Sequence, residues 1–145
     1  MRLTSHTDYA LRILMALGAV SDRLMTIEEL AARHRISRNH LMKVAQSLVG
    51  LGLVKSVRGR RGGLMLGRAP SEIRMGTVIR ALETDCELVA CLGTAPETCV
   101  FSGVCRLTGA LRQAMTAFFA ELDQLTLADL VANRQAVRTR LQVAA

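Results

Sequence analysis

The chain has 145 residues, half of them hydrophobic, and a formal net charge of +7. This length suits one domain, or a small domain with an appendage, and the apolar content excludes an intrinsically disordered chain because it is sufficient to bury a core. With one Tyr, three Phe and no Trp, the core must consist mainly of aliphatic side chains, which favour helices when they recur at helical spacing.

The positive charge is concentrated in the first part of the sequence. Residues 1–80 contain 14 Lys or Arg and 5 Asp or Glu, a balance of +9, whereas residues 81–145 contain 5 and 7, a balance of −2. A basic segment attracts polyanions because neutralising phosphates releases counterions. Double-stranded DNA is therefore the expected partner, and an acidic membrane surface is the alternative.

Membrane insertion is not expected. The longest apolar run near the N-terminus, residues 9–20, is interrupted by Arg12 and is far shorter than the roughly 20 residues that cross a bilayer. Because no signal peptide or anchor is evident, we expect a cytoplasmic protein. In that reducing compartment, clustered cysteines more often bind metal or carry out redox chemistry than form disulfides.

Three helices are predicted in the basic part. Residues able to cap a helix precede each one: the first begins near Thr4, the second after Thr26, and the third, residues 38 to about 51, after Ser37. The tight turn before the third helix contains Arg35 where glycine is frequent, so we expect the turn to adopt a conformation that does not require glycine.

A β-hairpin follows the third helix. Residues 53–57 and 64–66 have the character of strands, and the intervening residues 58–63 form a glycine-rich turn. A polar connection then leads into a short helix that ends near residue 83. The order helix, turn, helix, hairpin predicts a mainly α fold with a small β-hairpin, that is, a winged helix-turn-helix domain.

The C-terminal part is predicted to contain one long amphipathic helix. Periodicity lapses over residues 85–105, and the helix follows. Its apolar stripe consists of Leu107, Leu111, Ala114, Met115, Phe118, Phe119 and Leu122. The stripe fits a dimerisation helix or a helix packed on the core. A short helix after Thr126 and a tail complete the chain, which divides into residues 1–83 (DNA-binding domain), 84–105 (cysteine loop) and 106–145 (dimerisation helix and tail).

The predicted DNA contacts lie on the third helix and on the hairpin. Arg pairs with guanine and Asn with adenine in the major groove, while Ser and Lys suit phosphates and His suits either. Clustered arginines on a narrow hairpin suit a minor groove. The candidate residues are Ser37, Arg38, Asn39, His40 and Lys43 on the helix, and Arg58, Arg60 and Arg61 on the hairpin.

The cysteines predict a metal centre. Cys91, Cys99 and Cys105 are separated by seven and five residues in a polar loop, where three soft thiolates suit an iron–sulfur cluster or zinc. The absence of a C-x-x-C pair argues against a zinc ribbon, and a fourth ligand must come from elsewhere. Burial as small hydrophobic side chains is the alternative. Cys86, which lies between Asp85 and Glu87, is interpreted as a bystander.

Several segments resemble one known family. Residues 3–12, 37–44 and 57–63 resemble the family of iron–sulfur winged helix-turn-helix repressors that includes NsrR and IscR, and the cysteine loop fits the same family. Residues 105–109, 118–119 and 126–130 are most similar to its nitric-oxide-sensing members. The resemblance covers nearly the whole chain.

This resemblance implies a homodimer, not an enzyme. It implies that the three loop cysteines hold a 2Fe-2S or 4Fe-4S cluster, and that the fourth ligand is Asp8 of the partner subunit. It also implies a repressor that leaves its DNA operator when nitric oxide attacks the cluster. The alternatives are a regulator that senses iron or cluster status, a zinc-bound constitutive DNA binder, and an electron-transfer protein or enzyme that uses the same cluster.

Overall fold

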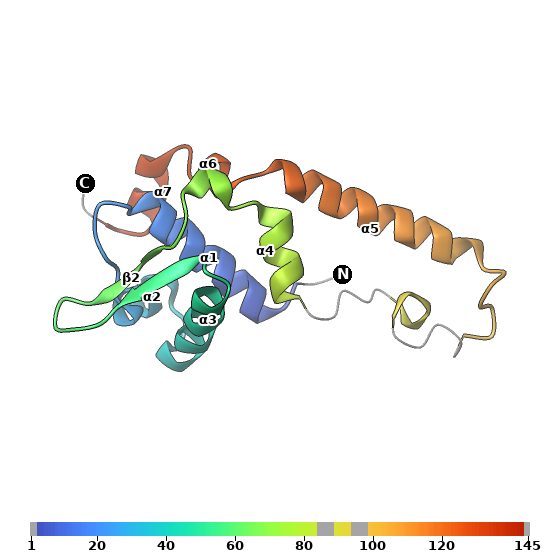
Figure 1. Ribbon diagram of the computed structural model, residues 1–145, viewed down its shortest axis with the longest axis horizontal. Helices are drawn as coiled ribbons and strands as arrows, with labels where there is room; N and C mark the ends of the chain where they lie inside the picture. The colour runs from blue at the N-terminus through green and yellow to red at the C-terminus, as the bar shows by residue number, and fades with distance from the viewer. Residues whose placement is uncertain (1–2, 84–88, 94–98, 144–145) are drawn as a thin grey trace.

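The computed structural model describes residues 3–83, 89–93 and 99–143, and Cys86 and Glu87 lie outside these ranges. The described part is mainly helical with one antiparallel two-stranded hairpin, so the predicted fold class is confirmed (Figure 1). The elements in chain order are α1 (Ser5–Ala19), α2 (Ile27–His34), α3 (Arg38–Gly50), β1 (Val54–Val57), β2 (Gly63–Leu66), the 3-10 turn η1 (Pro70–Glu72), α4 (Met75–Leu82), the 3-10 turn η2 (Ala90–Leu92), α5 (Arg106–Gln124), α6 (Leu127–Leu130) and α7 (Arg134–Arg140).

Side-chain caps start the first three helices where the sequence predicts them. The hydroxyl oxygens of Thr4, Thr26 and Ser37 each accept a hydrogen bond from the backbone N–H three residues later. These bonds satisfy donors that have no partner within the helix. The positions of α1, α2 and α3 along the chain are therefore fixed by local chemistry.

Arg35 makes the turn between α2 and α3. Its backbone is left-handed, with φ 55° and ψ 44°, and its N–H donates to the carbonyl groups of Ala31 and Ala32. The N–H of Ile36 also donates to the Ala31 carbonyl, at 3.0 Å. A left-handed residue other than glycine costs on the order of 1–2 kcal/mol. The expectation that the turn avoids the conformation typical of glycine is wrong, because Arg35 itself adopts the left-handed conformation.

The hairpin is attached to the helical body through one short bridge. Strands β1 and β2 pair in antiparallel register from Val54 with Leu66 to Val57 with Gly63. Met25, in the segment between α1 and α2, exchanges two backbone hydrogen bonds with Leu64 of β2, at 3.1 and 2.8 Å. Because this bridge holds β2 one pair away from the turn, only the turn at residues 58–62 is left to project from the body.

The hydrophobic core lies between α1, α2, α3 and the hairpin, and α6 and α7 close it from the other side of α1. The fully buried side chains include Ile13, Leu14, Leu17, Leu30, Leu41, Leu48 and Leu127. The sequence did not predict α7, which packs along α1. Arg33 secures the end of this segment, because its Nη1 donates to the carbonyl oxygens of Leu141 and Gln142 at 2.5 and 2.8 Å.

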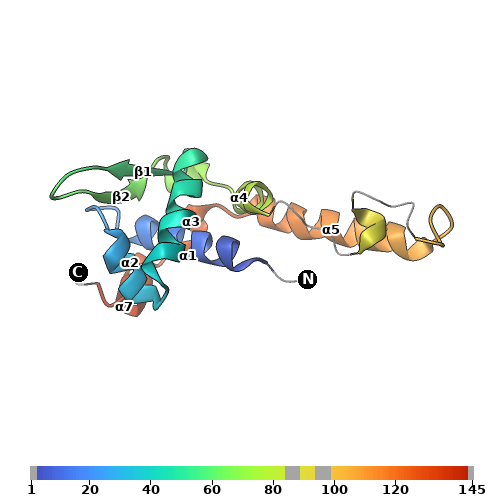
Figure 2. The same cartoon turned by 90° about the horizontal axis from the view of Figure 1, so that it is seen from below.

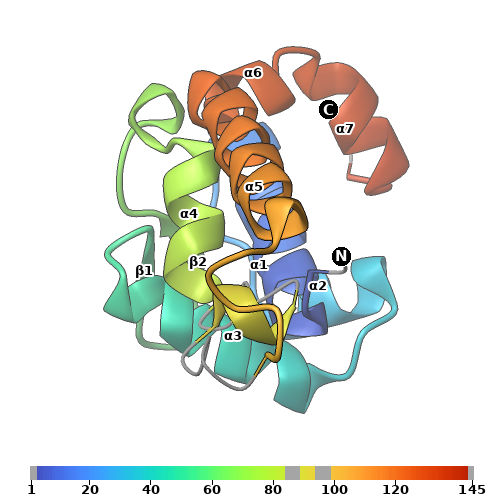
Figure 3. The ribbon, with the colours of Figure 1, turned by 90° about the vertical axis from the view of Figure 1, so that its right-hand side faces the viewer.

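Helix α5 leaves the body and extends away from it (Figures 1 and 2). Its 19 residues correspond to a length of about 28 Å at 1.5 Å per residue. None of its side chains is fully buried in the single chain, and Leu107 is 62% exposed. Viewed from the tip of α5, α4 lies beside it, α6 and α7 lie on one side, and α3 and β1 on the other (Figure 3). The apolar stripe of α5 is thus open along most of its length.

None of the helices in the described ranges is both long enough and apolar enough to cross a membrane.

Candidate DNA-binding surface and cysteine site

The predicted base-reading residues are exposed on the first turns of α3. Arg38, Asn39, His40 and Lys43 are exposed, and Ser37 caps the helix through the N–H of His40. The opposite face of α3 is buried through Leu41, Val44, Ala45 and Leu48. This burial orients the polar residues outward. Figure 2 shows α3 crossing α1 on the side from which the hairpin also extends.

Arg38 forms an ion pair that the sequence analysis did not anticipate. Its Nε donates to the Glu28 Oε1 of α2 at 2.6 Å, and both side chains are more than half exposed. This hydrogen bond from Arg38 is the main reason why the pKa of Glu28 lies below its ordinary value. The pair joins the first turns of the two helices that form the helix-turn-helix unit.

The hairpin tip carries the three predicted arginines on an exposed, narrow turn. Arg58, Arg60 and Arg61 are all exposed. The turn depends on glycine, because a Cβ at Gly62 would collide with the Val57 carbonyl oxygen and Gly59 has φ of +116°. Because the turn is tight, three positive charges are concentrated on a strip narrow enough to enter a DNA groove.

Two of the three predicted metal-ligating cysteines line one pocket at the free end of α5. Cys91 on η2 and Cys105, directly before α5, line this pocket of about 280 Å³ together with Thr108 and Arg112. The Cys91 Sγ lies 3.5 Å from the Thr108 Oγ1. Hydrogen bonds from the Thr108 backbone, the Thr108 hydroxyl and the Leu107 backbone lower the pKa of the Cys105 thiol. We refer to these four lining residues as the thiol pocket.

Cys99 does not line the thiol pocket. It begins a turn in which the Ser102 N–H donates to the Cys99 carbonyl at 2.9 Å, and its side chain is partly exposed. Within the described ranges, no three His, Cys, Asp or Glu side chains lie close enough together to hold a metal ion. The three cysteines are therefore near one another along one loop but are not assembled into a closed site within this single chain.

Asp8 lies on α1, in the body of the molecule. Its carboxylate accepts two hydrogen bonds from Arg12, at 3.1 and 2.7 Å, and it lines neither of the pockets that Cys91 lines. The thiol pocket lies at the far end of a helix about 28 Å long. Within one chain, Asp8 thus belongs to the body, whereas the thiol pocket lies at the free end of α5 (Figure 1).

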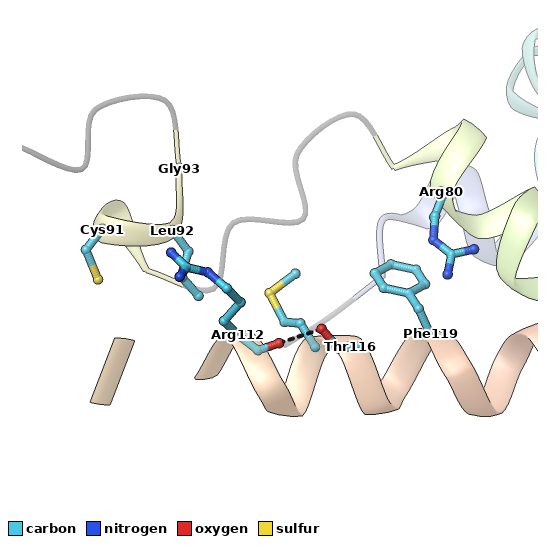
Figure 4. A pocket seen from close by; sticks show the side chains of 8 residues that line it. Arg80, Cys91, Leu92, Gly93, Arg112, Thr116 and Phe119 are labelled. Atoms are coloured by element: carbon cyan, nitrogen blue, oxygen red, sulfur yellow. Dashed lines mark hydrogen bonds between the residues drawn. The ribbon is translucent and has the colours of Figure 1, made fainter. Parts of the chain in front are cut away.

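A second pocket, of about 500 Å³, lies between η2, α4 and α5 (Figure 4). Arg112 extends from α5 toward η2 and lines both this pocket and the thiol pocket. At the other end, the Arg80 guanidinium lies 4.4 Å from the centroid of the Phe119 ring. This pocket thus runs along α5 from the η2 segment that carries Cys91 toward Arg80 of α4.

The sequence profile of the Rrf2 family, described as an iron-dependent transcriptional regulator, matches residues 3–133. The chain belongs to the Rrf2 family. A regulator named NsrR from Halalkalibacterium halodurans is 42% identical over 144 residues, which cover 99% of each chain. NsrR from Bacillus subtilis is likewise 42% identical over 144 residues, with 99% of each chain covered. The expected resemblance and the expectation of a protein that is not an enzyme are both confirmed.

Solved Rrf2 structures share the fold. CymR, the global cysteine regulator of B. subtilis, superposes with a TM-score of 0.68 at 26% identity and covers 92% of this chain and 98% of its own. IscR from T. potens superposes with a TM-score of 0.70 at 23% identity and covers 100% of this chain and 93% of its own. These similarities extend over α5 as well as the DNA-binding part.

Proposed function

We propose that this Rrf2 protein is a transcriptional repressor that binds operator DNA as a homodimer and whose DNA affinity depends on an iron–sulfur cluster. The observation that carries the proposal is the thiol pocket at the tip of a helix whose apolar stripe is open to solvent. The predicted DNA-reading residues lie on the body at the other end of that helix. The names of the 42%-identical relatives support the same assignment.

The chemistry of the site suits an iron–sulfur cluster. Cys91 and Cys105 open into one pocket, and Cys99 lies in the turn that leads to Cys105. Thiols are the usual ligands of such clusters, of the 2Fe-2S or the 4Fe-4S type. The resemblance to iron–sulfur repressors implies that the fourth ligand would be Asp8 of the partner subunit, and the Asp8 of the same chain lies on the body and not at the free end of α5. When bound, the cluster would supply iron atoms that take up nitric oxide.

The open stripe of α5 supports the homodimer. Apolar side chains such as Leu111, Met115 and Phe118 are only partly covered in the single chain, and a second α5 would cover them. In this arrangement the thiol pocket of one protomer meets α1 of the other. Residues 1–83 would contact DNA, residues 84–105 would hold the cluster, and α5 would join the protomers.

Release of the operator follows from how α5 is attached. Cys105 directly precedes the first residue of α5. Near the other end of α5, Asp123 forms an ion pair with Arg80 of α4. If the thiol pocket of one protomer and Asp8 of the partner subunit no longer bind the same cluster, the two protomers lose one of their links. The distance between the two α3 helices then changes, and half-sites on DNA require a fixed distance.

The test is to purify the protein without oxygen, measure iron, sulfide and visible absorption, and titrate a nitric oxide donor while measuring DNA binding. The DNA is obtained by selecting bound duplexes from a random pool. We expect a coloured protein whose affinity for the selected duplex falls as nitric oxide is added. Unchanged affinity after complete reaction refutes nitric oxide control, and a colourless zinc protein refutes the cluster.

A further inference from the structure

The ion pair between Glu28 and Arg38 places an acidic side chain next to a predicted base-reading residue. Residues 1–80 are strongly basic, and Glu28 and Glu29 are the acidic residues of α2. Glu29 is directed to Arg23 and Arg33, at 2.6 and 2.8 Å, whereas Glu28 is directed to Arg38 across the turn. The two neighbouring carboxylates thus have different partners, and only Glu28 contacts the predicted DNA-reading helix.

The backbone on both sides of this ion pair is fixed. Thr26 caps α2 two residues before Glu28, Ser37 caps α3 directly before Arg38, and Arg35 fixes the turn between them. The Cα atoms of Glu28 and Arg38 therefore keep a constant relation to each other. As a result, the carboxylate restricts the orientations available to a side chain that would otherwise have many rotamers.

The pair leaves the outer edge of the guanidinium available. Arg38 uses its Nε to donate to Glu28, and among the described residues Glu28 is its only side-chain partner. Its two terminal nitrogens, Nη1 and Nη2, retain a planar fork of N–H donors. That fork matches the O6 and N7 acceptors of guanine in the major groove.

We propose that Glu28 is a positioning and specificity-determining residue, which holds Arg38 so that its Nη1 and Nη2 face a guanine of the operator. This inference rests on the proposed function, because it requires that α3 reads DNA. Glu28 also carries a negative charge close to the DNA-contacting surface, where it opposes attraction to phosphates. Its removal therefore has two effects of opposite sign: binding to unrelated DNA becomes tighter, and discrimination for the guanine becomes weaker.

These two effects, tighter binding to unrelated DNA and weaker discrimination for the guanine, distinguish positioning of Arg38 from a merely structural role of Glu28. A structural defect would lower all DNA binding together and would lower the unfolding temperature. Glu28→Gln keeps the size of the side chain but removes its charge, and its amide oxygen is a much weaker acceptor for the Arg38 guanidinium than a carboxylate is. The matched control is Glu72→Gln in η1, which removes the same charge from a segment that packs against α6. In this control the side-chain amide oxygen can still accept the hydrogen bond that the Ala69 N–H donates to Glu72.

The first experiment compares wild type, Glu28→Gln and Glu72→Gln, each purified without oxygen, by sequencing the duplexes that they bind from one random pool. We expect the preference for one guanine position to fall about tenfold in Glu28→Gln alone. We also expect its affinity for an unselected duplex to rise. If Glu28→Gln and wild type show the same preference, the inference is overturned while the proposed function stands. If wild type selects no sequence, the proposed function fails as well.

A second experiment replaces that guanine by 7-deazaguanine, which lacks the N7 acceptor. Wild type is expected to lose about tenfold in affinity on this substitution, and Arg38→Ala is expected to be insensitive to it. If Glu28 positions Arg38, the loss is much smaller in Glu28→Gln than in wild type. An equal loss in the two proteins contradicts positioning even when Arg38 reads the base.

Discussion

Arg80 and Asp123 form a two-pronged ion pair that fastens the end of α5 to α4. The Arg80 nitrogens Nη1 and Nη2 donate to the two Asp123 carboxylate oxygens at 2.8 and 2.6 Å. Arg74 adds a hydrogen bond from its Nη1 to the Asp123 carbonyl at 3.0 Å. Because α4 packs on α1, this junction is one connection through which a movement of α5 reaches the body.

Replacing Arg80 by alanine is expected to separate cluster binding from DNA binding. The ion pair is partly exposed and screened by solvent, so its loss should change the unfolding free energy little. The thiol pocket does not include Arg80, so iron content and visible absorption should remain. DNA affinity should weaken by about 0.5–2 kcal/mol, because α5 is no longer held at a fixed angle. Loss of the cluster in this variant would contradict the separation.

Gly76 is expected to tolerate no side chain. A Cβ at this position would collide with the Asp123 Oδ1, and Arg80 keeps that carboxylate in place. Gly76→Ala should therefore lower the unfolding free energy by about 1–3 kcal/mol. The control is Gly50→Ala, since a Cβ at Gly50 meets no atom within 4 Å. Urea denaturation measures both changes, and equal stability of the two variants would show that the junction can adjust.

Cysteine variants test which thiols bind the cluster. We expect Cys105→Ser and Cys99→Ser to abolish visible absorption and bound iron, because each removes one of three loop thiolates, whereas Cys86→Ser should retain both. All three proteins are purified in parallel without oxygen and analysed for iron and sulfide. A colourless Cys86→Ser protein would reverse the assignment of Cys86 as a bystander.

The features that the sequence predicted are those set by neighbours in the chain. The caps at Thr4, Thr26 and Ser37 depend on a hydroxyl and an N–H three residues apart, so a short window of sequence contains both partners. The place of the turn at Arg35 and the hairpin were predictable for the same reason, whereas the left-handed conformation of Arg35 was not expected. The candidate DNA-reading residues were assigned from the position of α3 relative to that hairpin, and their role stays a prediction.

The features that the sequence did not reveal depend on distant pairs. Arg80 and Asp123 are 43 residues apart, and Arg33 is 108 residues from Leu141, so no local pattern indicates these contacts. The helix α7 was missed because its apolar side is short and becomes evident only against α1. By contrast, Thr108 was detectable, since it lies one helical turn after Cys105 on the same face.

The hairpin and α3 are expected to contribute to DNA binding in different ways. Arg60→Ala should weaken binding to all sequences and reduce the slope of log affinity against log salt concentration by about 1, because it removes one positive charge from the turn that is predicted to enter the minor groove. Asn39→Ala should instead cost about 1–3 kcal/mol on the preferred duplex alone, by relaxing the choice of one base pair. Binding over a salt series on selected and unrelated duplexes separates these outcomes. A sequence-specific effect of Arg60→Ala would contradict its assignment.

His34 is expected to make the folded state sensitive to mild acid. Burial, and to a smaller extent the nearby Arg12, lower the pKa of His34 below the value of about 6.5 found in unfolded chains, and its Nε2 is buried without a hydrogen-bond partner among the described residues. Below about pH 6.5 the unfolded chain therefore takes up a proton that the folded protein resists, so stability falls as the pH falls. Glu29, whose pKa is lowered to about 2, mainly by Arg23, stays ionised in this range.

His34→Gln should accordingly flatten the decline in unfolding free energy between about pH 7 and pH 5.5, because it removes the group that takes up the proton. The matched control is His40→Gln, since His40 is exposed on α3. Urea denaturation at the two pH values gives the slope for each protein. If wild type and His34→Gln lose the same stability over this interval, another group takes up the proton, and the burial of His34 has no energetic consequence there.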